Sequence, residues 1–188
     1  LENHKRKTVD LNIAKNYISK GAAGLIDFSC PKVSSLERSK LISDYLEIYK
    51  KNLFIKTHLF NGISEVIDTL VSKNIKWGIV TNKPSYLVLP IIEMLNFTHV
   101  PNCIVAGDTL SVKKPNPEPL IYASKQISID PIFCAYVGDD LRDIVAANAA
   151  KMFSVAAAYG FISDTNQIKE WESDYIIDSP LDLKNLIS

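Results

Sequence analysis

The sequence predicts an α/β fold in which helices cover both faces of a parallel, doubly wound sheet. Short apolar runs typical of buried strands alternate with amphipathic helical patterns from Asn61 onward. Polar residues that could carry chemistry follow directly after several of those runs. The 188 residues, 47% hydrophobic and 22% charged, suffice for one core with a small additional unit. Parallel strands place their carboxyl ends at one sheet edge, where α/β proteins bind ligands.

Residues 1–56 are predicted to form a small helical unit without a convincing strand. The stretch Leu36–Lys51 has helical apolar spacing, and Gly21 and Gly24 mark a turn or loose helix end before it. Residues 57–188 are predicted to form the α/β core. Its expected elements are, in order, a helix capped by Asn61, a strand at Ile75–Val80, a helix around Ser85–Leu95, a strand at Cys103–Ala106, a helix at Pro117–Ile127, a strand at Ile132–Val137, a helix at Asp140–Ala150, strands at Phe153–Ala156 and Tyr175–Ile177, and a short helix at Leu181–Ile187.

Charge, cysteine usage and hydropathy argue against several classes of protein. The 21 basic residues equal the 21 acidic ones, so net charge gives no reason to expect nucleic acid or an anionic membrane as a partner. Cys30, Cys103 and Cys134 are widely spaced, which favours reduced thiols over a disulfide framework or a zinc site. No apolar run approaches the ~18 residues of a membrane span, and the first residues do not resemble a signal peptide. We therefore expect a cytoplasmic protein.

A cluster of aspartates follows the third expected strand of the core. The run Tyr136–Gly138 ends in Asp139, and Asp143 lies four residues further, on the same side of a first helical turn. Carboxylates at a strand end suit a hard cation such as Mg²⁺, which prefers oxygen ligands. An acidic helix start would explain the same residues, because Asp is favoured there. Either interpretation fits this segment taken alone.

Two further polar positions follow neighbouring strands. Thr81 ends a strand, where its hydroxyl and the following backbone N–H groups could meet an oxyanion. Lys113 and Lys114 lie in a proline-stiffened loop, where a lysine could neutralise phosphate. Each alone is also explained as an ordinary polar loop. Together with the aspartates they supply donors, a cation and a metal seat, the groups that phosphoryl transfer requires.

These segments resemble three motifs of the haloacid dehalogenase (HAD) superfamily, particularly its phosphoglycolate phosphatases. Val80-Thr-Asn-Lys-Pro84 is similar to the second motif, Gly107-Asp-Thr…Lys114-Pro-Asn-Pro117 to the third, and Val137-Gly-Asp-Asp…Asp143 to the fourth. Phe60-Asn-Gly62 resembles the junction between the cap and the core in that family. The resemblance extends from about residue 16 to residue 187, and three motifs in order are highly specific. It implies a Rossmann-like core.

The resemblance implies a role for each matching residue. Thr81 and Asn82 would hold phosphoryl oxygens, Lys114 would bridge the phosphate and the nucleophile, Asp139 would bind Mg²⁺, and Asp143 would orient Lys114 or support the metal shell. Residues 1–56 would be part of a mobile cap that helps to choose the substrate. The implied activity is Mg²⁺-dependent hydrolysis of a small phosphorylated metabolite, with 2-phosphoglycolate as first choice, through an aspartyl-phosphate.

The first motif of the family, Asp-x-Asp-Gly-Thr, is absent from residues 1–188. Asp27 follows apolar residues but has no second Asp and no Gly-Thr after it, so we reject it as the nucleophile. We expect the core to lack its first central strand, between those ending at Thr81 and Gly138, and these residues alone to be inactive. Lys151 also departs from the family, which usually has glycine there, and raises the question of how tight that turn is.

Other functions remain open at this point. A pyrophosphatase, a sugar-phosphate mutase or a dehalogenase could share the fold, although the metal-seat carboxylates weigh against a dehalogenase. A non-catalytic protein that binds phosphate or a partner is the alternative from a different class. A segment bearing Asp-x-Asp would favour a phosphatase or mutase. A segment with the first Asp alone would favour a dehalogenase, and a segment with neither Asp would favour a non-catalytic binding protein. The sequence does not indicate an oligomeric state.

Overall fold

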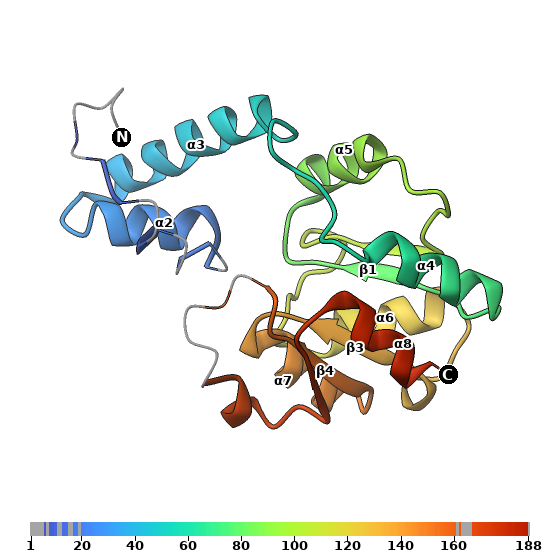
Figure 1. The fold of residues 1–188 in the computed structure, drawn as a ribbon. Coiled ribbons are helices and arrows are strands. Elements are labelled where there is room, and N and C mark those ends of the chain that lie inside the picture. Colours follow the sequence, from blue (N-terminus) through green and yellow to red (C-terminus); the bar gives the residue numbers. More distant parts are fainter. Residues whose placement is uncertain are drawn as a thin grey trace. The chain divides into compact units, whose positions relative to one another are not determined.

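A computed structural model describes residues 6, 8–10, 13–14, 17–18, 20–160, 162 and 167–187 (Figure 1). The chain divides into two compact units, residues 1–55 and residues 56–188. The boundary expected from the sequence lies at residue 56. We describe each unit by itself.

The first unit is a helical pair. Helix α2 (Gly21–Ser29) packs on α3 (Ser35–Lys51). Their shared core consists of buried Ile26, Cys30 and Leu41. The helix expected at Leu36–Lys51 is therefore present. The expectation for Gly21 and Gly24 is only half correct, because Gly21 begins α2 with a φ of 69° whereas Gly24 lies inside the helix.

The second unit contains two parallel sheets. Strand β1 (Gly78–Val80) pairs with β2 (Cys103–Val105). Strand β4 (Phe153–Ala157) lies between β3 (Ala135–Gly138) and β5 (Tyr175–Ile177). Strands that alternate with helices and pair in parallel confirm the predicted α/β class.

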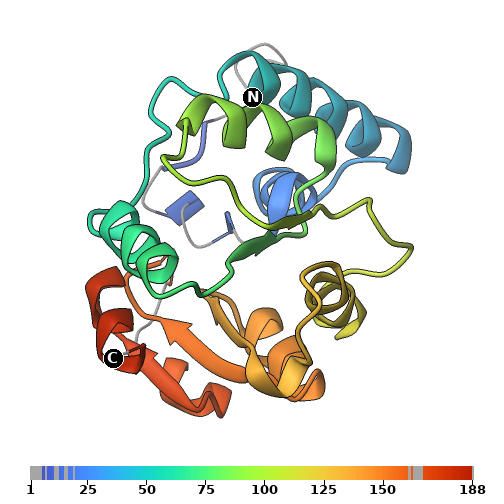
Figure 2. The same ribbon diagram turned by 90° about the vertical axis from the view of Figure 1, so that its right-hand side faces the viewer.

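The helices of this unit precede, separate and follow the strands in sequence. They are α4 (Ile63–Ser72), α5 (Ser85–Leu95), α6 (Glu118–Gln126), α7 (Leu141–Ala149) and α8 (Leu183–Leu186), with short 3₁₀ helices η2 (Pro131–Phe133), η3 (Gln167–Trp171) and η4 (Pro180–Asp182). Helices α4 and α8 lie side by side in both ribbon views (Figure 2). None of the helices in the described part of the chain has the length and apolar character that crossing a bilayer requires.

Residues on the two faces of β4 pack against different helices. Ala156 packs with Ile144 of α7 on one face, whereas Val155 clusters with Ile177 and with Leu183 of α8 on the other. Side chains alternate between the faces of a strand, so a strand covered on both faces is apolar throughout. Parallel strands in the order β3–β4–β5 with helices on both faces fit the α/β fold that the sequence predicts.

The two sheets share a core but no backbone ladder within the described residues. Val80 of β1 and Tyr136 of β3 pack against one buried cluster that includes Leu120 of α6 and Ala146 of α7. Strand β1 pairs with β2, and β3 pairs with β4. The sequence predicts that a central strand is missing between the ends of β1 and β3. That statement stays a prediction.

Three details of the expected elements are wrong. The strand expected at Ile75–Val80 is formed only from Gly78 onward, and Ile75 is 38% exposed. Ile132 and Phe133 lie in η2 rather than in a strand and are 65% and 82% exposed. Apolar side chains raise strand propensity, but a strand also needs a neighbouring backbone with which to pair.

The third correction concerns the start of α4. Gly62, rather than Asn61, occupies the N-cap position, with a left-handed φ of 92°. A Cβ on Gly62 would come within 2.8 Å of the Leu181 side chain. Both the backbone conformation and this close approach require glycine here. Gly62, near the start of the second unit, therefore packs against Leu181 of η4, near the end of that unit.

Candidate active site

Loops that follow β1, β2 and β3 carry the predicted site residues. We call them the Thr81 loop (residues 81–84), the Lys114 loop (residues 106–117) and the Asp139 turn (residues 139–140). The Thr81 N–H donates to Val105 O over 2.9 Å, and Lys83 N–H donates to Thr81 Oγ1 over 3.1 Å. Thr81 therefore stands at the carboxyl edge of its sheet, with its position fixed by backbone hydrogen bonds.

Lys114 is the most closely held residue of the site. Its side chain is 8% exposed, and its Nζ lies 2.8 Å from Asp143 Oδ1. The same Nζ donates to Val80 O over 3.0 Å and to Tyr136 Oη over 2.5 Å. A buried ammonium group is tolerated because a carboxylate and hydrogen-bond acceptors surround it. Lys114 thus connects the end of β1 with β3 and α7.

Asn82 holds the backbone of Lys114 in place. Its Nδ2 donates to Lys114 O over 2.9 Å, and its Oδ1 accepts from Lys114 N over 3.0 Å. The resemblance implies that Asn82 contacts phosphate beside Thr81. In this structure both the oxygen and the nitrogen of its amide bind the backbone of the Lys114 loop. Asn82 therefore fixes the position of that loop relative to the end of β1.

The first residues of the Lys114 loop also form hydrogen bonds with the Thr81 loop and with the start of α5. Gly107 N donates to Lys83 O over 2.8 Å, and a Cβ on Gly107 would come within 2.1 Å of Asn82 O. Asp108 accepts from the N–H and the hydroxyl of Ser85, each over 2.8 Å. These hydrogen bonds lower the pKa of Asp108 and satisfy a donor at the start of α5.

The aspartates after β3 divide into two roles. Asp140 caps α7 by accepting from Arg142 N over 2.9 Å, and it pairs with the Arg142 guanidinium. Asp143 is 8% exposed and faces Lys114. Gly138 makes room for it, because a Cβ there would come within 2.3 Å of Asp143 Cβ. The acidic helix start is therefore present at Asp140, whereas the assignment of Asp139 and Asp143 as site carboxylates stays a prediction.

Asp139 lies between the end of β3 and the segment that follows β4. A Cβ on Gly160 would come within 2.2 Å of Asp139 Cβ, so the segment after β4 closes tightly on this residue. Burial raises the pKa of Tyr136 well above its ordinary value, and the charges of Asp143 and Asp139 add to this effect. Burial, with a contribution from Asp139, also raises the pKa of Tyr159. Both hydroxyls therefore stay protonated at neutral pH.

The residues present fit one side of a magnesium site. Asp139 supplies a hard oxygen donor at a strand end, and Mg²⁺ is typically held by one or two carboxylates together with waters and substrate phosphate. Within the described residues, no three His, Cys, Asp or Glu side chains come together in an arrangement that could hold a metal ion. Asp143 uses its Oδ1 for Lys114, and its support of a metal shell stays a prediction.

Asp27, the aspartate rejected as nucleophile, forms an ion pair within the first unit. It belongs to α2 of the first unit, and its Oδ2 accepts from Arg38 Nη2 over 2.9 Å. The Arg38 hydrogen bond lowers the pKa of Asp27, which keeps it ionised on an exposed helix face. An exposed carboxylate that is paired with arginine is an ordinary surface ion pair.

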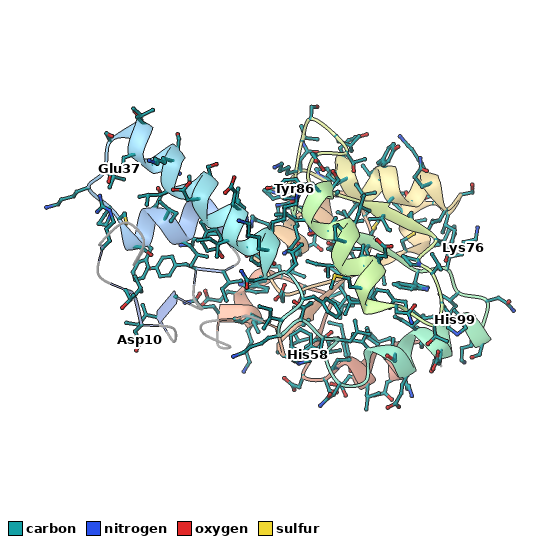
Figure 3. The ribbon with its side chains drawn as sticks, turned by 90° about the horizontal axis from the view of Figure 1, so that it is seen from above. Asp10, Glu37, His58, Lys76, Tyr86 and His99 are labelled. Carbon is teal, nitrogen blue, oxygen red and sulfur yellow. The ribbon has the colours of Figure 1, made fainter. Side chains whose placement is uncertain are left out.

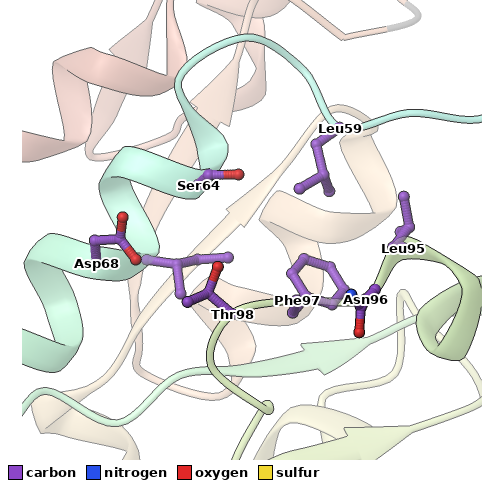
Figure 4. Close-up of a pocket in the computed structure, with 8 residues that line it drawn as sticks. Leu59, Ser64, Asp68, Leu95, Asn96, Phe97 and Thr98 are labelled. Carbon is purple, nitrogen blue, oxygen red and sulfur yellow. The ribbon is translucent and has the colours of Figure 1, made fainter.

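The small pocket in Figure 4 lies apart from the predicted residues. It is lined by Leu59, Ser64, Ile67, Asp68, Leu95, Asn96, Phe97 and Thr98. His99 Nε2 lies 3.2 Å from Asp68 Oδ1 beside it, and His99 is labelled in Figure 3. None of Thr81, Lys114 and Asp139 contributes to its wall.

Sequence reasoning missed Tyr136 and Asp108 as parts of the site. Tyr136 interrupts an apolar strand, where an aromatic residue usually indicates core packing. Asp108 lies inside the Gly107-Asp-Thr segment, with Ser85 at the expected start of α5. That spacing could have suggested a cap, although only the fold brings residues 23 positions apart together.

Comparisons with known proteins identify the family of this chain. The family model described as haloacid dehalogenase-like hydrolase matches residues 12–157. An N-acetylmuramic acid 6-phosphate phosphatase of Pseudomonas putida is 33% identical over 182 residues, covering 95% of this chain and 81% of that protein. A phosphoglycolate phosphatase of Xanthomonas campestris pv. campestris is 35% identical over 163 residues, covering 87% and 74%.

Two solved structures share this fold. A crystal structure of a predicted phosphoglycolate phosphatase from Haemophilus somnus 129PT superimposes with a TM-score of 0.90 at 23% identity, covering 100% of this chain and 87% of that one. A hydrolase from Pseudomonas syringae superimposes with a TM-score of 0.76 at 21% identity, covering 100% and 86%. At these identities the likeness concerns the fold. The family match and the two phosphatase relatives show that the chain belongs to the haloacid dehalogenase-like hydrolase family and is related to its phosphoric monoester hydrolases.

Proposed function

We propose that residues 1–188 carry the phosphate-binding groups and the metal carboxylate of a Mg²⁺-dependent phosphatase for small phosphomonoesters. The observation that carries this proposal is the place of the Lys114 ammonium group. It lies between Val80 O, at the end of β1, and Asp143, in the first turn of α7. A buried cation at the joint edge of two parallel sheets suits a phosphoryl group, whose transfer depends on charge neutralisation and positioning.

The roles of the surrounding residues follow from their positions. Thr81 would offer its hydroxyl to a phosphoryl oxygen at the end of β1. Asp143 would orient Lys114, as its 2.8 Å contact with the ammonium group suggests. Asn82 would act chiefly through the backbone of Lys114, to which its amide is bonded. Asp139 would be a ligand of Mg²⁺, which neutralises phosphate charge when bound.

The phosphoryl acceptor is the part that this sequence does not supply. The Asp-x-Asp-Gly-Thr motif is absent from residues 1–188, and Asp27 is paired with Arg38 on a helix. We propose that turnover needs an aspartate on a strand seated between β1 and β3, whose facing edges carry no strand partner within the described residues. That aspartate would form the aspartyl-phosphate intermediate.

The names of the relatives provide the first substrates to test. The Xanthomonas protein is named for phosphoglycolate and the Pseudomonas protein for N-acetylmuramic acid 6-phosphate. Both are small phosphorylated metabolites, in line with the substrate class expected from the sequence. We propose 2-phosphoglycolate first, and we place the protein in the cytoplasm because Cys30, Cys103 and Cys134 are all unpaired thiols.

Phosphate binding without turnover is the second candidate function. The absence of Asp-x-Asp from the sequence favours it, because Thr81, Lys114 and Asp139 can bind and neutralise charge without a phosphoryl acceptor. The two candidates share the same binding groups. They differ in whether a strand bearing the nucleophile restores hydrolysis.

The test of the binding site is a titration with inorganic phosphate in the presence of Mg²⁺. Lys114→Met should weaken phosphate binding by at least about tenfold, because a charged hydrogen bond contributes about 1.5–3 kcal/mol. Lys113→Met is the matched control, since Lys113 is the exposed neighbour in the same loop. Isothermal titration calorimetry measures both. Equal affinities in the two variants would remove Lys114 from the site.

The metal assignment has its own variant. Asp139→Asn keeps the shape of the side chain and removes its charge, so Mg²⁺ should no longer enhance phosphate binding while the melting temperature changes little. Asp178→Asn, on an exposed carboxylate after β5, is the control. Enhancement by Mg²⁺ that persists in Asp139→Asn would show that the metal is held elsewhere.

A further inference from the structure

The ammonium group of Lys114 has no proton left for a ligand. An ammonium group has three N–H donors and no acceptor. In this structure Nζ meets Asp143 Oδ1 at 2.8 Å, Val80 O at 3.0 Å and Tyr136 Oη at 2.5 Å. Three protein acceptors for three protons is a complete set. A phosphate oxygen can therefore reach this ammonium group only by replacing one of them.

Two side chains donate hydrogen bonds to the Val80 carbonyl at the end of β1. It accepts from Lys114 Nζ and also from Tyr136 Oη, the latter over 2.8 Å. A carbonyl oxygen has two lone pairs, so two donors satisfy it. Val80 is the last residue of β1, whose described strand partner is β2. Side chains thus provide the hydrogen bonds that a neighbouring strand would otherwise donate.

Tyr136 is the residue that closes this arrangement. Its hydroxyl donates to Val80 O and accepts from Lys114 Nζ, so both of its functions are used. We propose that Tyr136 is a positioning residue for Lys114. The Tyr136 hydroxyl holds the Lys114 ammonium group at the edge of β1, so that phosphate must compete with this hydroxyl for the ammonium group. The proposal assigns a purpose to a tyrosine inside an otherwise apolar strand.

The strength of this restraint follows from the chemistry of the three acceptors. The Asp143 carboxylate is charged and binds the ammonium group most strongly, and a backbone carbonyl cannot leave its strand. The tyrosine hydroxyl and the Val80 carbonyl are both neutral acceptors, and of these two only the hydroxyl is carried by a side chain. The raised pKa of Tyr136 keeps its proton in place for Val80 O. An incoming phosphate therefore displaces the Tyr136 hydroxyl before either of the others.

The direct experiment observes the ammonium group itself. In chain labelled with ¹⁵N-lysine, the Lys114 ammonium protons should exchange slowly with water and show nuclear Overhauser contacts to the Tyr136 ring. Tyr136→Phe should accelerate this exchange several-fold, whereas Tyr175→Phe, on the 42% exposed tyrosine of β5, should not change it. The wild-type contact alone is informative if Tyr136→Phe is poorly folded. Absence of that contact, or unchanged exchange in a folded Tyr136→Phe, overturns the proposal.

The phosphate arm rests on the proposed function and can fail separately. Tyr136→Phe should bind inorganic phosphate about 2- to 10-fold more tightly, because one competing hydrogen bond contributes about 0.5–1.5 kcal/mol. If phosphate binds Lys114→Met as well as it binds wild type, the proposed function fails, and the exchange measurement still decides the role of Tyr136. If Lys114→Met loses binding and Tyr136→Phe binds no more tightly than Tyr175→Phe, the competition is overturned.

Discussion

Lys151 connects α7 to β4 through a left-handed backbone, with a φ of 60°. Its N–H donates to Asn148 O, and the next N–H, of Met152, donates to Ala147 O, each over 3.0 Å. Helices often end in this way, usually with glycine at the left-handed position, because a Cβ is crowded there. The tight turn that the sequence put in question at Lys151 is therefore formed, with a side chain where the family usually has none.

We predict that Lys151→Gly stabilises the protein by about 1 kcal/mol, the strain relieved in the left-handed region less the entropy that glycine adds to the unfolded chain. Lys151→Ala is the matched control, since it removes the same charge and keeps the Cβ. Urea denaturation at neutral pH compares the two. A gain in Lys151→Ala equal to that in Lys151→Gly would indicate that charge rather than backbone strain is responsible.

At the scale of elements, the loop after β2 positions the loop after β1. Asn82 and Lys114 exchange two hydrogen bonds, and Asp108 binds the first residue of α5. Gly107 allows this contact, because the loops approach too closely for a Cβ. The candidate phosphate site is thus built by loop-to-loop contacts that no single segment contains.

This support should be sensitive to acid. The Ser85 hydrogen bonds hold the pKa of Asp108 below its usual value, so their contribution to stability is present above the unfolded carboxyl pKa and is lost as pH falls through the folded pKa. We predict that wild type exceeds Asp108→Asn in stability at neutral pH and that the difference shrinks in the acidic range. Thermal melts between neutral and acidic pH measure it, with Ser85→Ala as the partner in a double-mutant cycle. A difference that is constant with pH would contradict the assignment.

The order of the elements could be predicted from the sequence, whereas several strand boundaries could not. The alternation of strands and helices from β1 to β5 follows from apolar spacing, which reflects burial. Ile75, Ile132 and Phe133 are equally apolar and lie outside strands, because pairing depends on a neighbouring backbone that periodicity does not reveal. Their exposure shows that an apolar residue next to a sheet edge need not be buried.

The predicted site residues followed from motif order, and their contacts did not. The positions of Thr81, Lys114 and Asp139 after successive strands are those expected from the resemblance, while their roles remain proposals. The part played by Tyr136 could not be foreseen, because it depends on a carbonyl of another strand 56 residues away. Side-chain contacts between distant segments are set by packing, which a linear pattern does not encode.

At the scale of the whole molecule, the second unit contains the proposed binding loops and, within the described residues, two separate parallel sheets. Its two sheets meet through the cluster around Leu120 and through the side chains of Tyr136 and Lys114. Unpaired strand edges inside a protein are costly unless other groups satisfy them. We interpret this arrangement as a phosphatase core that requires an additional strand, between β1 and β3, to supply its nucleophile.

The most direct test of this interpretation is a paired phosphatase assay. Residues 1–188 and a version extended at the amino end by an Asp-x-Asp strand are each given 2-phosphoglycolate and p-nitrophenyl phosphate with Mg²⁺. We predict no turnover by residues 1–188, since they offer no phosphoryl acceptor, and turnover by the extended chain that disappears when the first added Asp is changed to Asn. Turnover by residues 1–188 as fast as that of the extended chain would contradict the interpretation, and Asp27 would then be the first residue to test as the nucleophile.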